Sequence, residues 1–271
     1  LHAADERNPI KRTMKKSAVH RFEKFCRQAV RDADLVFAHN AAVAQRFADV
    51  WSDRCHLFDR SFVTDENLID DAELHRRQAQ ALDASQPLRL IAAGRQIAIK
   101  GTDQLLRAVR IAIDGGAQIE LNVMGEGDDL PQFKKLADEL RLNGCVRFSG
   151  TVAYGKPLFD AWADGNVIGI TNLTAEISRN VLLAMARGLA VLTYANPGTD
   201  ALIQQNDAGV IVPRGDVNAL AAAIVRLVSD RRRVAELIAS GLKVAHQHTL
   251  NATHRRRAEL AAKLAAPSGQ V

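Results

Sequence analysis

From Leu88 onward, apolar runs and helix-like segments alternate regularly, and this alternation limits the possible folds more than any other pattern in the chain. Strands are predicted at 88–93, 118–124, 145–148, 167–171, 190–194 and 209–212. Helices are predicted at 102–114, 130–141, 156–164, 180–187, 199–205, 216–229 and 231–246. Strands joined through helices pair in parallel by right-handed crossovers. The predicted fold class is therefore α/β, a Rossmann-like parallel sheet of about six strands with helices on both faces.

The rest of the chain divides by composition and periodicity. Residues 1–60 show a helical pattern, a short strand and a second helical pattern, which we interpret as the remnant of a truncated N-terminal α/β domain. Because the chain starts at Leu1 and not at Met, we expect a fragment or a processed product. Residues 61–87 are polar and acidic, and we predict a linker there. Residues 88–246 form the Rossmann-like domain, and 247–271 form an amphipathic C-terminal helix and tail.

The chain is basic, with a formal net charge of +5 and a sequence pI near 9.3. Its Lys and Arg residues stand in short clusters, which either solubilise helix faces or favour an anionic partner. Aromatic residues make up 5% of the chain and do not alternate with basic ones, so a base-stacking surface for nucleic acid is not expected. A phosphorylated small molecule or an anionic membrane surface fits at least as well.

Cysteine usage and hydropathy indicate the compartment. The three cysteines lie far apart and match no metal-ligand spacing, so we expect reduced thiols in a cytoplasmic protein. No apolar stretch approaches the roughly 20 residues that cross a bilayer, so any contact with the inner face of the membrane would be peripheral. The histidines also lack metal-ligand spacing, and we predict neither a metal site nor a cofactor.

The first candidate site is the loop 94–101, which follows the predicted strand 88–93. It carries Arg95, whose planar guanidinium can bind two oxygens, and Lys100, a mobile point charge. Such a pair suits the two phosphate groups of a diphosphate. The alternative is that both side chains are simply solvated.

The second candidate site is Glu176, which lies between the predicted strand 167–171 and the helix 180–187. Ser178 or Asn180 is expected to cap that helix, whose free N–H groups favour an anion. A carboxylate at this place can accept hydrogen bonds from sugar hydroxyls. Alternatively, Glu176 only complements the helix dipole. Both sites follow strand ends, and together they suit a pyrophosphate joined to a sugar, that is, a nucleotide sugar.

A series of motifs then points to a known family. In order, they are GR-x4-KG at 94–101, Gly125-Glu126-Gly127, the run 146–152, Glu176 followed by 180–186, Gly198-Thr199-Asp200, and the run 207–213 with Gly215-Asp216. This order and spacing resemble the retaining glycosyltransferases of the GT-B fold, the glycosyl transferases group 1 family. The likeness runs from about Leu88 to Leu227 and centres on the C-terminal, donor-binding domain of that family.

The resemblance implies a role for each matched residue. Arg95 and Lys100 match the pair that holds the donor diphosphate and stabilises the leaving group. Glu176 matches an acid that contacts the transferred sugar, and the loop 150–152 matches the segment whose backbone reads the nucleobase. The resemblance thus predicts Arg95, Lys100 and Glu176 as catalytic residues, and Gly94, Gly125, Val152, Ser178, Arg179 and Asn180 as donor-binding residues. Family members work without a bound metal.

The sequence departs from the family pattern in three ways. Ala184 stands where the family has a second Glu that commonly holds the ribose. Ile177 and Arg179 replace smaller residues, and Arg179 either adds a phosphate contact or blocks the sugar pocket. The family's N-terminal domain, which supplies the acceptor site, is almost wholly missing. The chain is thus expected to hold the donor half of a site.

Two functions from different classes remain open. The first is the donor-binding part of a retaining glycosyltransferase, which moves a hexosyl group from a UDP- or GDP-sugar to a glycan or lipid-linked acceptor. The alternative is a non-catalytic homologue, or a subunit whose active site a partner chain completes. An NAD-dependent oxidoreductase is not expected, because the segment 125–128 lacks the third glycine of a dinucleotide fingerprint and carries acids that would repel a pyrophosphate.

Overall fold

The computed structural model describes residues 9–38, 41–58, 61–174 and 178–265. The chain divides into two compact units, Leu1–Arg60 with Arg257–Val271 and Ser61–Arg256. We call the first the small unit and the second the sheet unit. The C-terminal helix α11 (Leu250–Ala265) contributes residues to both.

The small unit has a minimal parallel sheet. Its elements in chain order are α1 (Pro9–Asp32), β1 (Val36–Ala38), α2 (Ala41–Arg46) and β2 (Cys55–Leu57). Strand β2 was not predicted from the sequence; it pairs in parallel with β1, and Val36 lies opposite Cys55. Arg54 lies next to β2 and donates hydrogen bonds to the carbonyl oxygens of Ala33, at 2.9 Å, and Arg31, at 3.2 Å. This side chain therefore holds the C-terminal end of α1.

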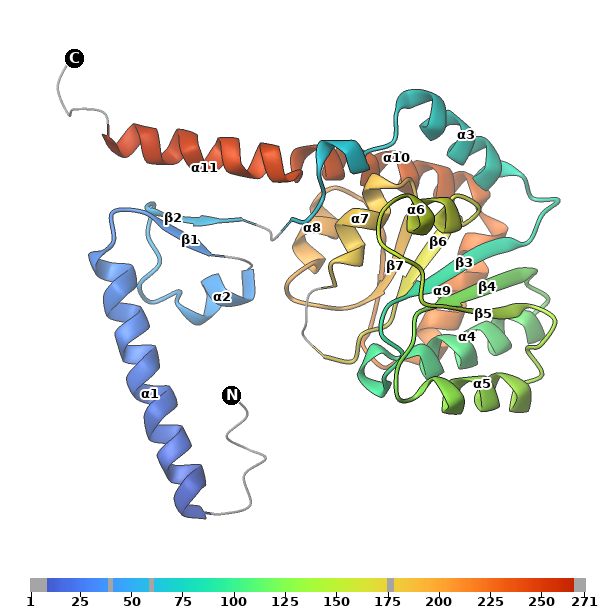
Figure 1. Ribbon diagram of the computed structural model, residues 1–271, viewed down its shortest axis with the longest axis horizontal. Helices are drawn as coiled ribbons and strands as arrows, with labels where there is room; N and C mark the ends of the chain where they lie inside the picture. Colours follow the sequence, from blue (N-terminus) through green and yellow to red (C-terminus); the bar gives the residue numbers. More distant parts are fainter. Residues whose placement is uncertain (1–8, 39–40, 59–60, 175–177, 266–271) are drawn as a thin grey trace. The chain divides into compact units, whose positions relative to one another are not determined.

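The sheet unit contains the predicted six parallel strands (Figure 1). They are β3 (Leu88–Ala93), β4 (Ile119–Met124), β5 (Val146–Gly150), β6 (Val167–Ile170), β7 (Ala190–Tyr194) and β8 (Val210–Val212). Their order across the sheet is β5-β4-β3-β6-β7-β8. The chain therefore starts at the centre, builds one half outward, returns, and builds the other half. The predicted fold class is confirmed, and the point where the order reverses lies between β3 and β6.

Helices cover both faces of this sheet (Figure 1). In chain order they are α4 (Thr102–Asp114), α5 (Leu130–Glu139), α6 (Lys156–Trp162), α7 (Asn180–Ala186), α8 (Asp200–Gln205), α9 (Val217–Ser229) and α10 (Arg231–Gln247). Alternating side chains of β3 feed two apolar clusters, since Leu90 joins one and Ile91 the other. Every residue of β6 and β7 is buried. Continuous burial is typical of central parallel strands, which explains their unbroken apolar runs.

The segment 61–87, which the sequence predicts as a linker, belongs to the sheet unit and contains a helix, α3 (Asp71–Leu82). The Asp70 side chain caps α3 by accepting a hydrogen bond from the Glu73 N–H at 2.8 Å. The helix packs along α10. Its periodicity is hard to see in the sequence because one of its two buried residues is Arg77, a charged side chain at an inward position.

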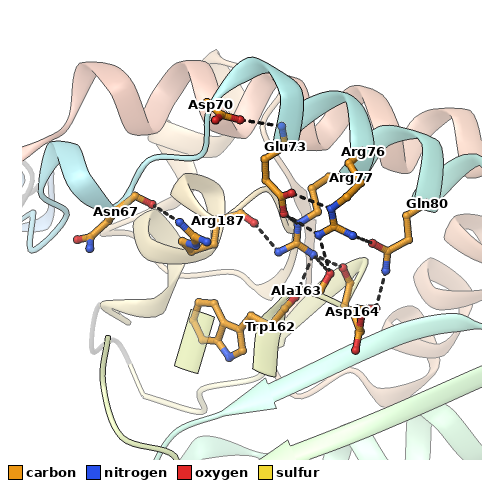
Figure 2. A network of polar contacts seen from close by, with 11 residues as sticks. Asn67, Asp70, Glu73, Arg76, Arg77, Gln80, Trp162, Ala163, Asp164 and Arg187 are labelled. Carbon is orange, nitrogen blue, oxygen red and sulfur yellow. Dashed lines mark hydrogen bonds and ion pairs between the residues drawn. The ribbon is translucent and has the colours of Figure 1, made fainter. Parts of the chain in front are cut away.

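Arg77 is 1% exposed and joins α3 to the ends of two other helices (Figure 2). Its guanidinium donates hydrogen bonds to the carbonyl oxygens of Trp162, Ala163 and Gly165 at the C-terminal end of α6, and to that of Arg187 after α7. Burial lowers the pKa of Arg77 to about 10, against a smaller opposing effect of Glu73. The buried charge is tolerated because helix C-terminal carbonyls, which carry partial negative charge, surround it.

Candidate functional site

The candidate site lies at the carboxyl edge of the sheet, where β3 and β6 end side by side. In open α/β sheets, this reversal point is where the loops of the two halves diverge and leave a crevice for a ligand. The loop after β3 carries the predicted residues Gly94, Arg95 and Lys100. The loop after β6 leads to Ser178, Arg179 and Asn180. The topology thus brings the two predicted stretches to neighbouring strand ends.

Direct hydrogen bonds join the two loops. The Thr171 hydroxyl donates to the carbonyl oxygens of Lys100, at 3.0 Å, and Gly101, at 2.9 Å. The Leu173 N–H donates to the Ile99 carbonyl oxygen at 2.8 Å. Gly101 has a φ of 69°, and a Cβ there would lie 2.1 Å from the Thr171 carbonyl oxygen. Only glycine allows this approach, so the Lys100-Gly101 pair fixes the distance between the loops.

Asn180 adds a third link between the two halves of the sheet. Its side-chain amide donates to the Ala93 carbonyl oxygen, the last of β3, at 2.7 Å. Its backbone N–H donates to the Ser178 hydroxyl at 3.3 Å, so Ser178 satisfies one free donor at the start of α7. Both residues were predicted to bind the donor. The structure places them at the carboxyl edge of the sheet, where the Asn180 amide has a structural task.

The cationic residues differ in their surroundings. Arg95 is exposed and Lys100 is half-buried, and both lie on the same loop. Arg179 is exposed, and its guanidinium lies over the Phe62 ring, 5.2 Å from the ring centroid. The third predicted catalytic residue, Glu176, lies outside the described residues. The two cations predicted for the diphosphate are therefore on one short loop, and Arg179 has an aromatic partner.

The loop after β4 packs against the same edge. Gly125 has a φ of 115°, and its N–H donates to the Gly150 carbonyl oxygen at 2.6 Å. A Cβ on Gly125 would lie 2.0 Å from the Gly94 carbonyl oxygen. The predicted residues Gly94 and Gly125 are thus in backbone contact, which only glycine permits at position 125. Val152, predicted from the next loop, is half-buried against an apolar cluster.

Gln96 is a residue at this site that sequence reasoning missed. It is 2% exposed, while its neighbour Arg95 is exposed. Its side chain hydrogen-bonds to the backbone of two strand ends and to Thr102. A glutamine next to an arginine in a short loop gives no local sign of burial, because the groups that surround it come from distant parts of the chain.

Ala184, the main departure from the family pattern, is fully buried in the apolar cluster formed by α7 and its neighbours. Its carbonyl oxygen accepts the N–H groups of Arg187 and Leu189 at the end of α7. A carboxylate at this position would have to be buried among apolar side chains. The side chain at position 184 therefore offers no carboxylate that could hold a ribose.

Among the described ranges, no group of three or more His, Cys, Asp or Glu side chains is placed to hold a metal ion. No helix in the part of the chain that the structure describes is long and apolar enough to span a bilayer.

Comparison with protein-family models decides the family. Residues 87–230 match the model described as "Glycosyl transferases group 1". The chain belongs to this family. The matched range covers β3 to α9, which includes the whole carboxyl edge described above. The resemblance predicted from the motifs is therefore confirmed, and the GT-B assignment fits the Rossmann-like sheet.

Curated glycosyltransferases are similar to parts of the sequence. The amylovoran biosynthesis glycosyltransferase AmsK of Erwinia amylovora is 30% identical over 194 residues, which are 66% of this chain and 46% of AmsK. The GDP-mannose-dependent alpha-(1-6)-phosphatidylinositol monomannoside mannosyltransferase of Mycobacterium tuberculosis is 29% identical over 163 residues, 56% of this chain and 41% of that enzyme. This chain spans about half the length of these curated relatives or less.

The fold is shared with solved glycosyltransferase structures. HepE of Anabaena, solved in complex with UDP, superposes with a TM-score of 0.70 at 19% sequence identity. The superposition covers 87% of this chain and 65% of HepE. At this identity the likeness establishes the architecture.

Proposed function

We propose that this chain binds a nucleotide-sugar donor at the carboxyl edge between β3 and β6, as the donor-binding part of a retaining hexosyltransferase. The acceptor would be a glycan or a lipid-linked glycan. Membership of the group 1 family supports a transferase, the HepE complex supports a nucleoside diphosphate ligand, and the name of the mycobacterial relative supports a nucleotide sugar as donor. UDP and GDP both remain candidates for the nucleotide.

The observation that carries the proposal is the junction of the two predicted loops. Thr171 and Asn180 hydrogen-bond across the reversal point to Gly101 and Ala93. This junction holds the Lys100 backbone next to the loop that follows β6. A ligand in the crevice would therefore meet the diphosphate-binding loop on one side and the sugar-binding loop on the other.

The chemistry assigned to these loops is charge stabilisation during group transfer. The bond between the sugar's anomeric carbon and the β-phosphate oxygen breaks, and the nucleoside diphosphate leaves with the electron pair. The acceptor hydroxyl oxygen forms the new bond to the anomeric carbon on the same face of the sugar, and its proton passes to the oxygen of the leaving diphosphate. Arg95 and Lys100 would stabilise the negative charge that develops on the leaving diphosphate, and Glu176 would orient the sugar hydroxyls.

Calorimetry with UDP, GDP and their hexose conjugates tests donor binding. Arg95→Ala and Lys100→Ala should each weaken nucleoside diphosphate binding by about 1.5–3 kcal/mol, the value of a hydrogen bond to a charged group. Lys135→Ala is the matched control, since Lys135 is an exposed residue of α5 that is 3.7 Å from Glu139. An unchanged dissociation constant for both loop variants would reject their assigned roles.

A second candidate function is a nucleotide-sugar-binding homologue without activity of its own, or one that a partner chain completes. The burial of Ala184 in an apolar cluster favours it, because the acid of the family pattern is absent there. An assay of donor hydrolysis and hexosyl transfer separates the two functions. Tight nucleotide-sugar binding without turnover would support the binding protein, whereas turnover would support the transferase.

A further inference from the structure

Gln96 is a buried polar residue in the partly exposed loop 94–101. The residue is 2% exposed, between the exposed Arg95 and the half-buried Ile97. Burying an amide without partners would cost free energy, so its burial has to be compensated by hydrogen bonds. The identity and position of those partners show what the side chain does.

The Gln96 side chain joins three elements. Its Nε2 donates to the carbonyl oxygens of Gly94, at 2.8 Å, and Met124, at 3.0 Å. Its Oε1 accepts the Thr102 hydroxyl at 2.8 Å. Both amide hydrogens and the amide oxygen are therefore used, and they connect the ends of β3 and β4 with the first residue of α4. Thr102 is itself 4% exposed, so this network is closed to solvent.

The backbone of Gln96 adds a second set of bonds to the loop after β4. Its N–H donates to the Glu126 carbonyl oxygen at 2.9 Å, and its carbonyl oxygen accepts the Asp129 N–H at 3.1 Å. A Cβ on Gly127 would lie 2.3 Å from the same carbonyl oxygen. The two loops are thus in backbone contact along Gln96, and little room remains for either to shift.

These bonds fix the backbone on both sides of Arg95. Before Arg95, the Gly94 N–H donates to the Met124 carbonyl oxygen at 3.1 Å, and the Gly94 carbonyl oxygen accepts a hydrogen bond from the Gln96 side chain. After it, Gln96 is held through all of its polar groups. Farther along, the Ala98 N–H donates to the Asp129 carboxylate at 2.7 Å. The Arg95 side chain therefore starts from a rigid point although the side chain itself is exposed.

We propose that Gln96 is a positioning residue for donor binding, which acts through Arg95 by fixing the backbone from which the guanidinium reaches the diphosphate. This inference rests on the proposed function. A loop that is ordered before binding loses less conformational entropy when the ligand arrives. Gln96 thus improves affinity for the diphosphate without touching it.

The test is a double-mutant cycle with UDP and GDP as probes in calorimetry. Gln96→Met keeps the length and volume but removes the donor to the Gly94 carbonyl oxygen, one of the two donors to the Met124 carbonyl oxygen, and the acceptor of the Thr102 hydroxyl. It should weaken nucleoside diphosphate binding about tenfold, comparable to the cost of ordering one residue. In an Arg95→Ala background the same change should cost less than about twofold, because the group it positions is gone.

The matched control is Asn166→Leu. Asn166 is 3% exposed, and its side-chain oxygen accepts the Arg89 N–H at 2.9 Å at the amino edge of the same sheet. This variant should lower stability and leave nucleotide affinity unchanged. If Gln96→Met fails to fold, Thr102→Val removes only the partner of Oε1, and it should lower affinity by about threefold, the equivalent of one weak hydrogen bond.

The outcomes are distinguishable. Unchanged affinity of the folded Gln96 or Thr102 variant, or an equal loss in the Arg95→Ala background, would overturn the positioning role and leave the proposed function intact. Failure of the wild-type protein to bind UDP or GDP would overturn the proposed function and the role of Gln96 with it. A tenfold loss that disappears in the Arg95→Ala background supports the inference.

Discussion

The small unit and the sheet unit both contain parallel strands, but they cover them differently. In the sheet unit, β6 and β7 are buried along their whole length between two apolar clusters. In the small unit, Phe37 of β1 is 38% exposed and Leu57 of β2 is 42% exposed. Phe25 of α1 is 69% exposed. Parallel strands need cover on both faces. The sheet unit satisfies this requirement by itself, and the described part of the small unit does not.

The largest expected difference between the units concerns two arginines that hold helix ends. Arg77→Ala in the sheet unit should destabilise that unit by about 3–5 kcal/mol, because it removes a fully buried side chain and the donor to the Gly165 and Arg187 carbonyl oxygens. Arg54→Ala in the small unit removes exposed hydrogen bonds to Arg31 and Ala33, and should cost less than about 1 kcal/mol. Chemical denaturation followed by circular dichroism measures both. A similar cost for the two variants would contradict the contrast in burial.

The next comparison uses apolar truncations. Leu121→Ala should lower the free energy of unfolding of the sheet unit by about 2–5 kcal/mol. Leu121 lies in β4 and is 1% exposed, so its truncation leaves a cavity. Phe25→Ala in the small unit should change stability by less than about 0.5 kcal/mol, as surface substitutions do. Each unit has one tryptophan, Trp51 and Trp162, so fluorescence reports on the sheet unit alone in a Trp51→Phe background and on the small unit alone in a Trp162→Phe background. A large effect of Phe25→Ala would show that its side chain is covered in solution.

The smallest effect is a pH dependence. The pKa of Glu73 is lowered mainly by its hydrogen bond from Arg76, so its ionised form stabilises the folded sheet unit. Because the folded pKa lies below the unfolded one, this stability is present above the unfolded pKa near 4.5 and is lost as the pH falls through the folded pKa. Glu73→Gln should reduce this loss of stability at acid pH by at most about 1 kcal/mol, because the ion pair is partly exposed.

Glu23→Gln in the small unit is the control for this measurement. Its pKa is also lowered, by a hydrogen bond from Arg46, but the carboxylate is in the other unit. Urea unfolding between pH 3 and pH 6, followed through Trp162, should respond to Glu73→Gln and not to Glu23→Gln. An identical response to both variants would mean that the units do not unfold separately.

Much of the fold could be predicted because its signals are local. The strand 88–93 and the helix 102–114 were placed at the bounds that the structure gives, since apolar runs and periodicity report burial directly. Strand β2 was missed because it has only three residues, and α3 because its inward face holds Arg77. In both cases the deciding partner is distant in the chain, so no local pattern could reveal it.

Residue pattern and motif order alone indicated the family, the α/β class, the positions of most elements in the sheet unit, and the two loops that carry the candidate cations. These follow from residue type, spacing and motif order, which act over a few residues at a time. The burial of Gln96 between β3 and β4, and the bonds of Arg77 to the ends of α6 and α7, became visible in the folded structure alone. The physical reason is that a polar side chain is buried only where distant backbone groups satisfy its hydrogen bonds, and those groups meet only after the chain has folded.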